Sequence, residues 1–415
     1  MIVSVVVVVV VTLASRTAAE TPRREVRALW VTRGEFRSAD DVERIVADAA
    51  GLNFNVILFQ VRGNGTVYYK SKIEPWAFES TSRDPKTTGR DPGWDPLAVA
   101  IAAARKHGVE LHAWVNVFPA WRSQRYAPKE SGQLWWAHPD WFMHDAAGER
   151  MTPRDSRVNE KVKDWYAFIS PGVPEVQKYL GEVCGEIVTN YDVDGLHYDY
   201  IRYPREITEV KREFRERAKR LGNWSYDSVS MKRFAEETGV ARPDDDPNKW
   251  FEWRAAQVTA TVKTIADRVR PIRAGTGAGA GARGKKLIIS AAVGADPEDS
   301  KLGKGQDYLA WMRQGTVDGV FLMGYTDDVD KFTKQCKGVI AKRPAGKGFV
   351  AAGVGVRSAA DVVAEEIEIT RKLGLDGFAA FSYAPLFPGS DGRATGETAD
   401  KLKAGALATP ATPPW

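Results

Sequence analysis

The chain has few cysteines, and this limits how its fold can be held together. Among 415 residues there are two, Cys184 and Cys336. A disulfide framework and a cysteine-rich metal cluster are therefore both excluded. Both residues lie in segments predicted to be helices, so we expect buried free thiols, and a single bridge between them is the alternative. A chain of this length can bury a sufficient core without cross-links.

Blocks of one charge are also missing. The 59 basic and 54 acidic residues give a net charge of +5 and are spread along the chain. No Lys/Arg run is long enough to predict a nucleic-acid partner. No His, Cys or acidic spacing forms a recognised metal motif, and no Gly-rich phosphate turn follows the first predicted strand. The sequence therefore predicts neither a metal nor a cofactor.

Long hydrophobic runs are absent except at the N-terminus. Residues 3–14 are almost wholly apolar, and the small residues Thr17, Ala18 and Ala19 follow them. The run is short for a bilayer span and fits a signal peptide over residues 1–19. No Lys or Arg precedes it, so an uncleaved anchor is the alternative. We expect a secreted or periplasmic protein with no stable membrane insertion beyond this segment.

From residue 25 onward, short β-branched runs alternate with amphipathic stretches, which predicts a parallel sheet with crossover helices. The predicted strands cover 26–32, 55–61, 109–115, 195–199, 287–293, 319–323, 348–353 and 377–381. The predicted helices cover 38–51, 96–107, 174–190, 248–270, 306–314, 328–341 and 358–373. The prediction is an α/β protein, a (β/α)₈ TIM barrel over residues 25–385. A doubly wound open sheet is the alternative.

The barrel is predicted to carry long βα loops. The longest irregular stretch runs from 118 to 171, and a helical insertion after the fourth strand covers 208–220 and 227–238. The Gly/Ala-rich stretch 274–284 is predicted to be a surface loop. Residues 386–415 are predicted to form a C-terminal tail. Its last dozen residues contain Pro410, Pro413 and Pro414, and we expect them to be loose.

In such barrels the active site lies at the C-terminal ends of the strands. Side chains alternate along a strand, so His197 and Asp199 share one face of the fourth strand, with Asp199 at its end. A buried unpaired carboxylate is costly, which favours a catalytic role for Asp199 over simple packing. The alternative is an ion pair with Arg202 or Arg62 that ties the barrel rim.

The other strand ends supply polar and aromatic side chains that suit a ligand with many hydroxyl groups. The predicted substrate-binding residues are Gln60, Arg62, His112, Trp114, Asn116, His197, Arg202, Tyr203, Tyr325 and Tyr383. Of the 14 tryptophans, Trp114, Trp121, Trp135, Trp136 and Trp141 cluster near one loop. Flat rings stack on sugar faces, so we expect this cluster to contact substrate.

Glycoside hydrolysis commonly uses two carboxyl groups. Asp199 is the clear candidate for one of them. Glu35, Asp296 and Asp327 each follow a predicted strand, and Glu35 and Asp327 are favoured as the second catalytic residue because they lie close to a strand end.

Several segments together resemble the glycosyl hydrolase-like 10 family. They are residues 27–31 (RALWV), 53–63 (NFNVILFQVRG), 112–117 (HAWVNV), 171–176 (PGVPEV) and 191–204 (YDVDGLHYDYIRYP). The resemblance covers residues 25–385 and implies a TIM-barrel glycosidase-like enzyme of bacterial envelopes. It also implies that at least some relatives act on peptidoglycan glycan strands and that Asp199 is an active-site carboxylate. Where relatives often read Met-Asn-Tyr, this chain has Met323-Gly324-Tyr325, which removes one amide.

We therefore expect a glycoside hydrolase that acts on a polysaccharide, either peptidoglycan glycan strands or an exopolysaccharide, by paired-carboxylate chemistry. A non-catalytic glycan-binding barrel is one alternative. A metal-dependent hydrolase such as a deacetylase, with His112, His197 and Asp199 as ligands, is the other.

Overall fold

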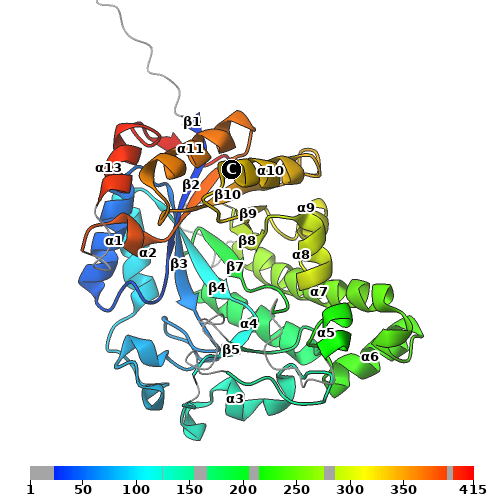
Figure 1. Cartoon of the computed structure of the whole chain (residues 1–415). Helices are drawn as coiled ribbons and strands as arrows, with labels where there is room; N and C mark the ends of the chain where they lie inside the picture. Colours follow the sequence, from blue (N-terminus) through cyan, green and yellow to red (C-terminus); the bar gives the residue numbers. More distant parts are fainter. Residues whose placement is uncertain (1–22, 124, 154–165, 205–214, 275–285, 390–395) are drawn as a thin grey trace, which may run out of the picture.

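The computed structural model describes residues 23–123, 125–153, 166–204, 215–274, 286–389 and 396–415. Eight parallel strands close into a barrel in which each strand pairs with the next one along the chain (Figure 1). The strands are β2 Val26–Val31, β3 Val56–Arg62, β4 Glu110–Asn116, β7 Gly195–Asp199, β8 Ile288–Gly294, β9 Gly319–Met323, β10 Phe349–Gly355 and β11 Gly377–Phe381. The predicted (β/α)₈ fold is confirmed, and the open sheet is excluded.

Helices surround the barrel and cover the outer faces of its strands. They are α1 Ala39–Gly51, α2 Pro96–His107, α4 Pro174–Asn190, α7 Pro247–Ala274, α8 Pro297–Lys304, α9 Tyr308–Gln314, α10 Val329–Ile340 and α11 Ala360–Lys372. The predicted N-cap Ser38 accepts a hydrogen bond from the Asp41 backbone N–H, and Gly108 ends α2 in the left-handed conformation. These local signals placed the helix ends correctly.

Two layers of core result from the period-2 alternation of the strands. One cluster lies between strands and helices. The other fills the barrel interior and includes Ala28, Trp30, Leu58, Trp114 and Phe321. On β4 and β7 several side chains that point into the barrel are polar. Trp114 pairs in register with His197, and Asn116 pairs with Asp199. The polar residues predicted on one face therefore do point into the barrel.

The loops contain more structure than predicted. The expected helix 306–314 corresponds to α9, which begins after its cap Asp307. A helix that was not predicted, α8, precedes it and ends at Gly305 in the left-handed conformation. The stretch after β4 holds a strand pair, β5 Pro119–Trp121 with β6 Ala167–Phe168, and a short helix, α3 Leu134–Ala137. The insertion after β7 contains α5 Arg215–Leu221 and α6 Ser228–Thr238. The predicted Gly/Ala loop falls almost wholly outside the described residues.

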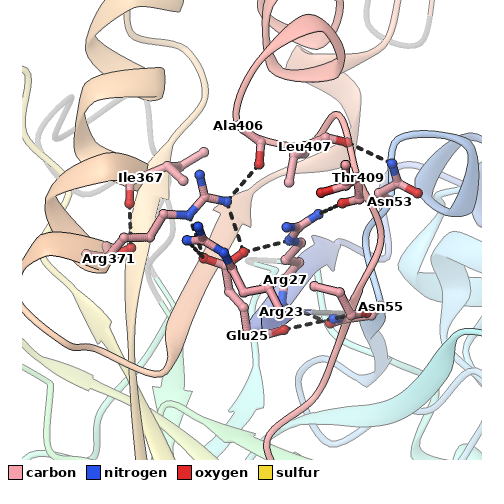
Figure 2. Close-up of polar contacts among 12 residues, drawn as sticks. Arg23, Glu25, Arg27, Asn53, Asn55, Ile367, Arg371, Ala406, Leu407 and Thr409 are labelled. Atoms are coloured by element: carbon pink, nitrogen blue, oxygen red, sulfur yellow. Dashed lines mark hydrogen bonds and ion pairs between the residues drawn. The ribbon is translucent and has the colours of Figure 1, made fainter. Parts of the chain in front are cut away.

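The prediction of a loose C-terminus is wrong. After α12 Tyr383–Leu386 and α13 Glu397–Ala404, a short strand, β12 Ala411–Thr412, pairs in parallel with β1 Arg23–Arg24. Figure 2 shows side chains that tie this segment to the barrel. Arg27 donates to the Thr409 carbonyl at 2.6 Å, Arg371 to Ala406 at 2.7 Å and Asn53 to Leu407 at 2.7 Å. The prolines limit regular structure, but they do not prevent these side-chain contacts.

The last residue closes the N-terminal end of the barrel. The Trp415 ring centroid lies 4.9 Å from that of Phe349, and its indole N–H donates to Glu110 at 3.0 Å. Nearby, the buried Glu25 forms ion pairs with both Arg27 and Arg371 (Figure 2). The C-terminal segment is therefore part of the folded barrel.

Cys184 and Cys336 are both buried free thiols, as predicted. The predicted signal peptide, residues 1–19, lies outside the described residues. Every helix that the structure describes is too short or too polar to cross a lipid bilayer.

Candidate active site

A cavity of about 590 Å³ opens at the C-terminal end of the barrel. Its wall comes from the loop after β2, the ends of β3, β4, β7 and β11, and the loops after β3 and β4. The lining residues are Thr32, Arg33, Gly34, Phe36, Arg37, Gln60, Phe78, Glu79, Arg83, Trp114, Asn116, Arg122, Ser123, Tyr166, Asp199, Tyr200 and Phe381. Because parallel strands end together, residues far apart in the sequence meet here.

Asp199 lies on the cavity wall and is 7% exposed. Its Oδ1 accepts a hydrogen bond from the Tyr200 backbone N–H at 2.7 Å and lies 3.3 Å from a guanidinium nitrogen of Arg202. Tyr200 has a φ of 49°, in the left-handed region that a bulky residue rarely adopts. Burial raises the pKa of the Asp199 carboxyl group, although Arg202 opposes the shift. The side chain is therefore suited to hold a proton.

Three other predicted substrate-binding residues line the same cavity: Gln60, Trp114 and Asn116. Gln60 accepts from the Arg33 backbone N–H at 3.0 Å. The Trp114 indole N–H donates to Asn116 at 2.9 Å, and Asn116 donates to the Gly63 carbonyl at 3.1 Å. These bonds orient the polar groups beside Asp199.

The remaining predicted aromatic residues of the mouth divide between rim and core. Tyr325 is 41% exposed, and its ring lies 5.5 Å from that of Phe381, a cavity residue that is 38% exposed. Tyr203 is buried, and the guanidinium carbon of Arg254 lies over its ring, 4.1 Å from the ring centroid. Tyr383 is also buried and donates to Asp48 at 2.7 Å. Tyr203 and Tyr383 are therefore packing residues outside the cavity lining.

Arg62 does not face the cavity. Gln60 pairs with Trp114 but Arg62 pairs with Val115, so β3 carries an extra residue between them. This bulge reverses the alternation and turns Arg62 out of the barrel. There Arg62 binds the buried Glu74 at 2.7 Å. The alternative in which Arg62 pairs with Asp199 is therefore wrong, whereas the predicted pair with Arg202 is present.

The two predicted histidines lie below the cavity and are fully buried. His112 pairs in register with Gly195, four residues before Asp199 along β7. At the rise of a β-strand this places His112 about 13 Å from Asp199, too far for the two to bind one metal ion. Among the described residues no group of three or more His, Cys, Asp or Glu could hold a metal. The structure therefore gives no support to the metal-hydrolase alternative.

Neither favoured second carboxylate lines the cavity. One oxygen of Glu35 accepts from the Ser382 hydroxyl at 2.7 Å and from the Ala384 backbone N–H at 2.8 Å, and burial raises the pKa of Glu35. Asp327 is exposed and accepts from the Ser358 hydroxyl. Asp296 caps α8. Each therefore has an evident structural role.

The tryptophan cluster is mostly core. Trp121, Trp135 and Trp141 are at most 8% exposed, and Trp136, at 37%, lies outside the cavity lining. Of the five, Trp114 alone is among the residues that line the described cavity. Trp114 is therefore the ring of this cluster that is placed to contact a ligand in the cavity, while Trp121, Trp135 and Trp141 are buried in the packing of the loop.

Sequence reasoning missed the cationic wall. Four lining residues are arginines: Arg33, Arg37, Arg83 and Arg122. Arg33 is buried, with its Nε 3.5 Å from Glu79 and its Nη2 donating to the Tyr166 hydroxyl at 3.1 Å. Arg33 comes directly after the first predicted strand, so its position near the barrel mouth could have been predicted from the sequence. The other three arginines lie in loops, where no periodic pattern predicts which way a side chain points.

Gly324 stands where the family resemblance implies an asparagine. A Cβ atom there would lie 2.8 Å from the side-chain oxygen of Gln335. The amide of Gln335, from α10, therefore occupies the space beside Gly324, and an asparagine would require Gln335 to move.

The sequence profile of the "Glycosyl hydrolase-like 10" family matches residues 25–347. The chain is 28% identical over 289 residues to an S-layer-related protein of Niallia circulans, covering 64% of this chain and 16% of that protein. It is 29% identical over 154 residues to glycosyl hydrolase DigH of Escherichia coli K12, covering 36% and 31%. It is 24% identical over 245 residues to glycosyl hydrolase YngK of Bacillus subtilis, covering 53% and 43%. The chain thus spans less than half of each relative's length.

Solved structures share the fold. The catalytic domain of β-amylase from Paenibacillus polymyxa has a TM-score of 0.58 at 12% identity, covering 94% of this chain and 100% of that one. An α-L-fucosidase from Paenibacillus thiaminolyticus has a TM-score of 0.53 at 15% identity, covering 94% and 49%. Identities this low support the barrel architecture alone.

Proposed function

Since this chain belongs to the glycosyl hydrolase-like 10 family, we propose that it hydrolyses glycosidic bonds in a bacterial polysaccharide and that Asp199 supplies one of the two carboxyl groups. The observation that carries the proposal is the position of Asp199, a nearly buried acid at a barrel strand end that borders an open cavity. A carboxyl group held partly protonated by burial can donate its proton to the glycosidic oxygen as the C–O bond breaks.

The cavity wall fits a carbohydrate. Phe381 and Tyr325 expose ring surface at the rim, and such rings stack on the apolar faces of sugars. Gln60 places an amide on the same cavity wall as Asp199; its oxygen accepts from the Arg33 backbone, and its NH2 group can donate to a sugar hydroxyl. The substrate proposed on this basis is a peptidoglycan glycan strand or an exopolysaccharide.

The arginines favour a substrate that carries carboxylate groups. Arg37 and Arg83 are exposed on the cavity wall, and neither guanidinium has a carboxylate partner within the described part of the chain. A guanidinium binds a carboxylate in a planar, two-bond arrangement. The carboxylates of an acidic glycan would form ion pairs with both guanidinium groups, whereas a neutral glycan would leave both groups hydrated.

We place the protein outside the cytoplasm, secreted or periplasmic. The apolar residues 3–14 and the small residues after them fit an export signal. One relative is named as S-layer-related, which fits the same location. Expression with and without residues 1–19, followed by fractionation, tests this part of the proposal.

The test of function is release of reducing ends from peptidoglycan glycan strands, acidic exopolysaccharides and neutral glucans. We expect turnover on at least one acidic polymer and a loss of about 10³-fold in Asp199→Asn. Asp327→Asn, which removes an exposed acid outside the cavity lining, is the matched control and should retain activity. Tight binding of one of these glycans without turnover would support the alternative, a glycan-binding barrel, and would refute the hydrolase.

A further inference from the structure

The cavity wall holds a carboxylate that the sequence patterns did not single out. Of the residues that line the described cavity, two carry carboxyl groups: Asp199 and Glu79. Glu79 belongs to a short 3₁₀ turn, η1 Phe78–Ser80, in the loop after β3. Glu35 and Asp327, the acids favoured from sequence, are not among the lining residues; Glu35 accepts from the Thr32 backbone N–H and the Ser382 hydroxyl, and Asp327 accepts from the Ser358 hydroxyl. Glu79 is therefore the acid placed to share a substrate with Asp199.

The Glu79 carboxylate is only partly engaged by the protein. Its Oε1 lies 3.5 Å from Nε of Arg33, and its side chain is 19% exposed. Its other oxygen, Oε2, is buried and makes no hydrogen bond of good geometry among the described residues, although the buried Tyr68 hydroxyl lies close enough to interact with the carboxylate. A buried carboxylate oxygen without a partner is costly and rare in a folded protein. The exposed part of the side chain is what a substrate or a water molecule in the cavity can reach.

Arg33 fixes the position of this acid. Its guanidinium is buried between Glu79 and the hydroxyl of Tyr166. The space for it depends on Gly63, because a Cβ atom at that position would lie 2.7 Å from Arg33 Nη1. Its backbone N–H is held by Gln60 at 3.0 Å. A side chain held at this many points keeps Glu79 in one orientation toward the cavity, as acid–base catalysis requires.

We propose that Glu79 is the second catalytic carboxylate of the site, acting opposite Asp199; this inference rests on the proposed glycosidase function. Asp199 donates its proton to the glycosidic oxygen as the bond from that oxygen to the anomeric carbon breaks. A water oxygen forms the new bond to the anomeric carbon, and Glu79 accepts the proton that this water loses. One bond breaks, one forms, and the acid and base have exchanged protonation states.

The surroundings of the two acids support this division of roles. Burial raises the pKa of Asp199, which favours its protonated form. Glu79, in contrast, forms an ion pair with a buried guanidinium that carries a positive charge throughout the physiological pH range.

The test compares Glu79→Ala, Glu79→Gln and the control Asp327→Asn, which removes an exposed acid outside the cavity lining and should retain activity, on the polysaccharide that the wild-type protein cleaves fastest in the panel above. We expect both Glu79 variants to lose about 10³-fold in kcat, while Glu79→Gln, whose amide oxygen can still accept a hydrogen bond from Arg33, remains folded at the assay temperature. Sodium azide should restore activity to Glu79→Ala and yield a glycosyl azide, because the small anion fits the vacated space and attacks the anomeric carbon. A purely structural role for Glu79 would give no such product.

The possible results separate this inference from the proposed function. If Glu79→Ala and Glu79→Gln keep more than about a tenth of wild-type activity while Asp199→Asn is inactive, Glu79 is not the second acid and the hydrolase proposal stands. The same conclusion follows if Glu79→Ala is folded and inactive but azide neither restores turnover nor forms the azide product. If the wild-type protein cleaves no glycan of the panel, both proposals fail together.

Discussion

The indole N–H of Trp30 donates to Nε2 of His197 inside the barrel, at a distance of 3.1 Å. Because Nε2 accepts this bond, the ring proton must lie on Nδ1, which faces the Ser290 hydroxyl at 3.0 Å. Burial, and to a lesser extent His112, lower the pKa of His197 well below its ordinary value of 6.5. His197 is therefore a neutral, hydrogen-bonded support beneath the active site, not a group that contacts substrate.

This histidine should make the fold sensitive to acid. Above pH 6.5 His197 is neutral in both the folded and unfolded chains, so its contribution to stability is fully present. Below that pH His197 binds a proton in the unfolded chain but stays neutral in the folded protein. The free energy of unfolding therefore falls with decreasing pH. The slope from one such group approaches about 1.4 kcal/mol per pH unit.

Chemical denaturation of wild type and His197→Asn between pH 5 and 7.5 measures this effect. The variant is expected to be less stable at neutral pH, because Trp30 and Ser290 lose a partner, but its stability should change less between pH 6.5 and pH 5. Parallel curves for the two proteins would show that His197 titrates normally in the fold.

Much of the barrel could be predicted from sequence because its signals are local. A strand buried on both faces has a short apolar run, and a helix has a cap at each end, as Ser38 and Gly108 illustrate. The position of Asp199 at a strand end follows from the same reasoning, because a run of five strand residues fixes which side chains share a face.

The rest of the site depends on features that have no sequence period. A single-residue bulge turned Arg62 away from the cavity, and a loop placed Glu79 on the cavity wall without any strand to predict it. The C-terminal segment was misjudged for a related reason. Two of its contacts are made by Arg27 and Asn53, which lie 382 and 354 residues away in sequence, and a third by Arg371, 35 residues away.

Trp415 offers a test of how much the C-terminal segment stabilises the barrel. Trp415→Ala removes ring contacts with Phe349 and the hydrogen bond to Glu110, and should lower the free energy of unfolding by about 2 kcal/mol. Activity should be unchanged, because Trp415 lies at the end of the barrel opposite the cavity. Trp136→Ala, which removes a 37% exposed ring, should cost less. Equal losses in the two variants would contradict a packing role for Trp415.

Arg37 and Arg83 should select carboxylate-bearing substrates. Both side chains are exposed, so each contact is screened, and the double variant Arg37→Ala/Arg83→Ala is expected to raise KM about tenfold with little change in kcat. The informative comparison uses the acidic polysaccharide that the wild type cleaves and the same polymer after chemical reduction of its carboxylates to alcohols. On the reduced polymer, wild type and variant should have the same KM.

If the double variant raised KM equally on both polymers, the two arginines would contribute to the shape of the cavity but would not bind the carboxylates of the substrate. Raising the ionic strength offers an independent check, because salt should weaken wild-type binding to the acidic polymer more than to its reduced form.

Arg202 should control the pH at which the proposed hydrolase activity is lost in alkali. Its guanidinium lies 3.3 Å from Asp199 and opposes the rise in pKa that burial imposes on that carboxyl group. In Arg202→Gln the positive charge is gone, so the pKa of Asp199 rises further. An acid catalyst works only while protonated, and activity falls as the pH passes its pKa. The alkaline limb of kcat/KM should therefore move to higher pH in this variant. Arg83→Gln, which lines the same cavity, should leave the limb in place. A limb that stays fixed in both variants, with melting temperatures unchanged, would assign the catalytic proton to a group other than Asp199.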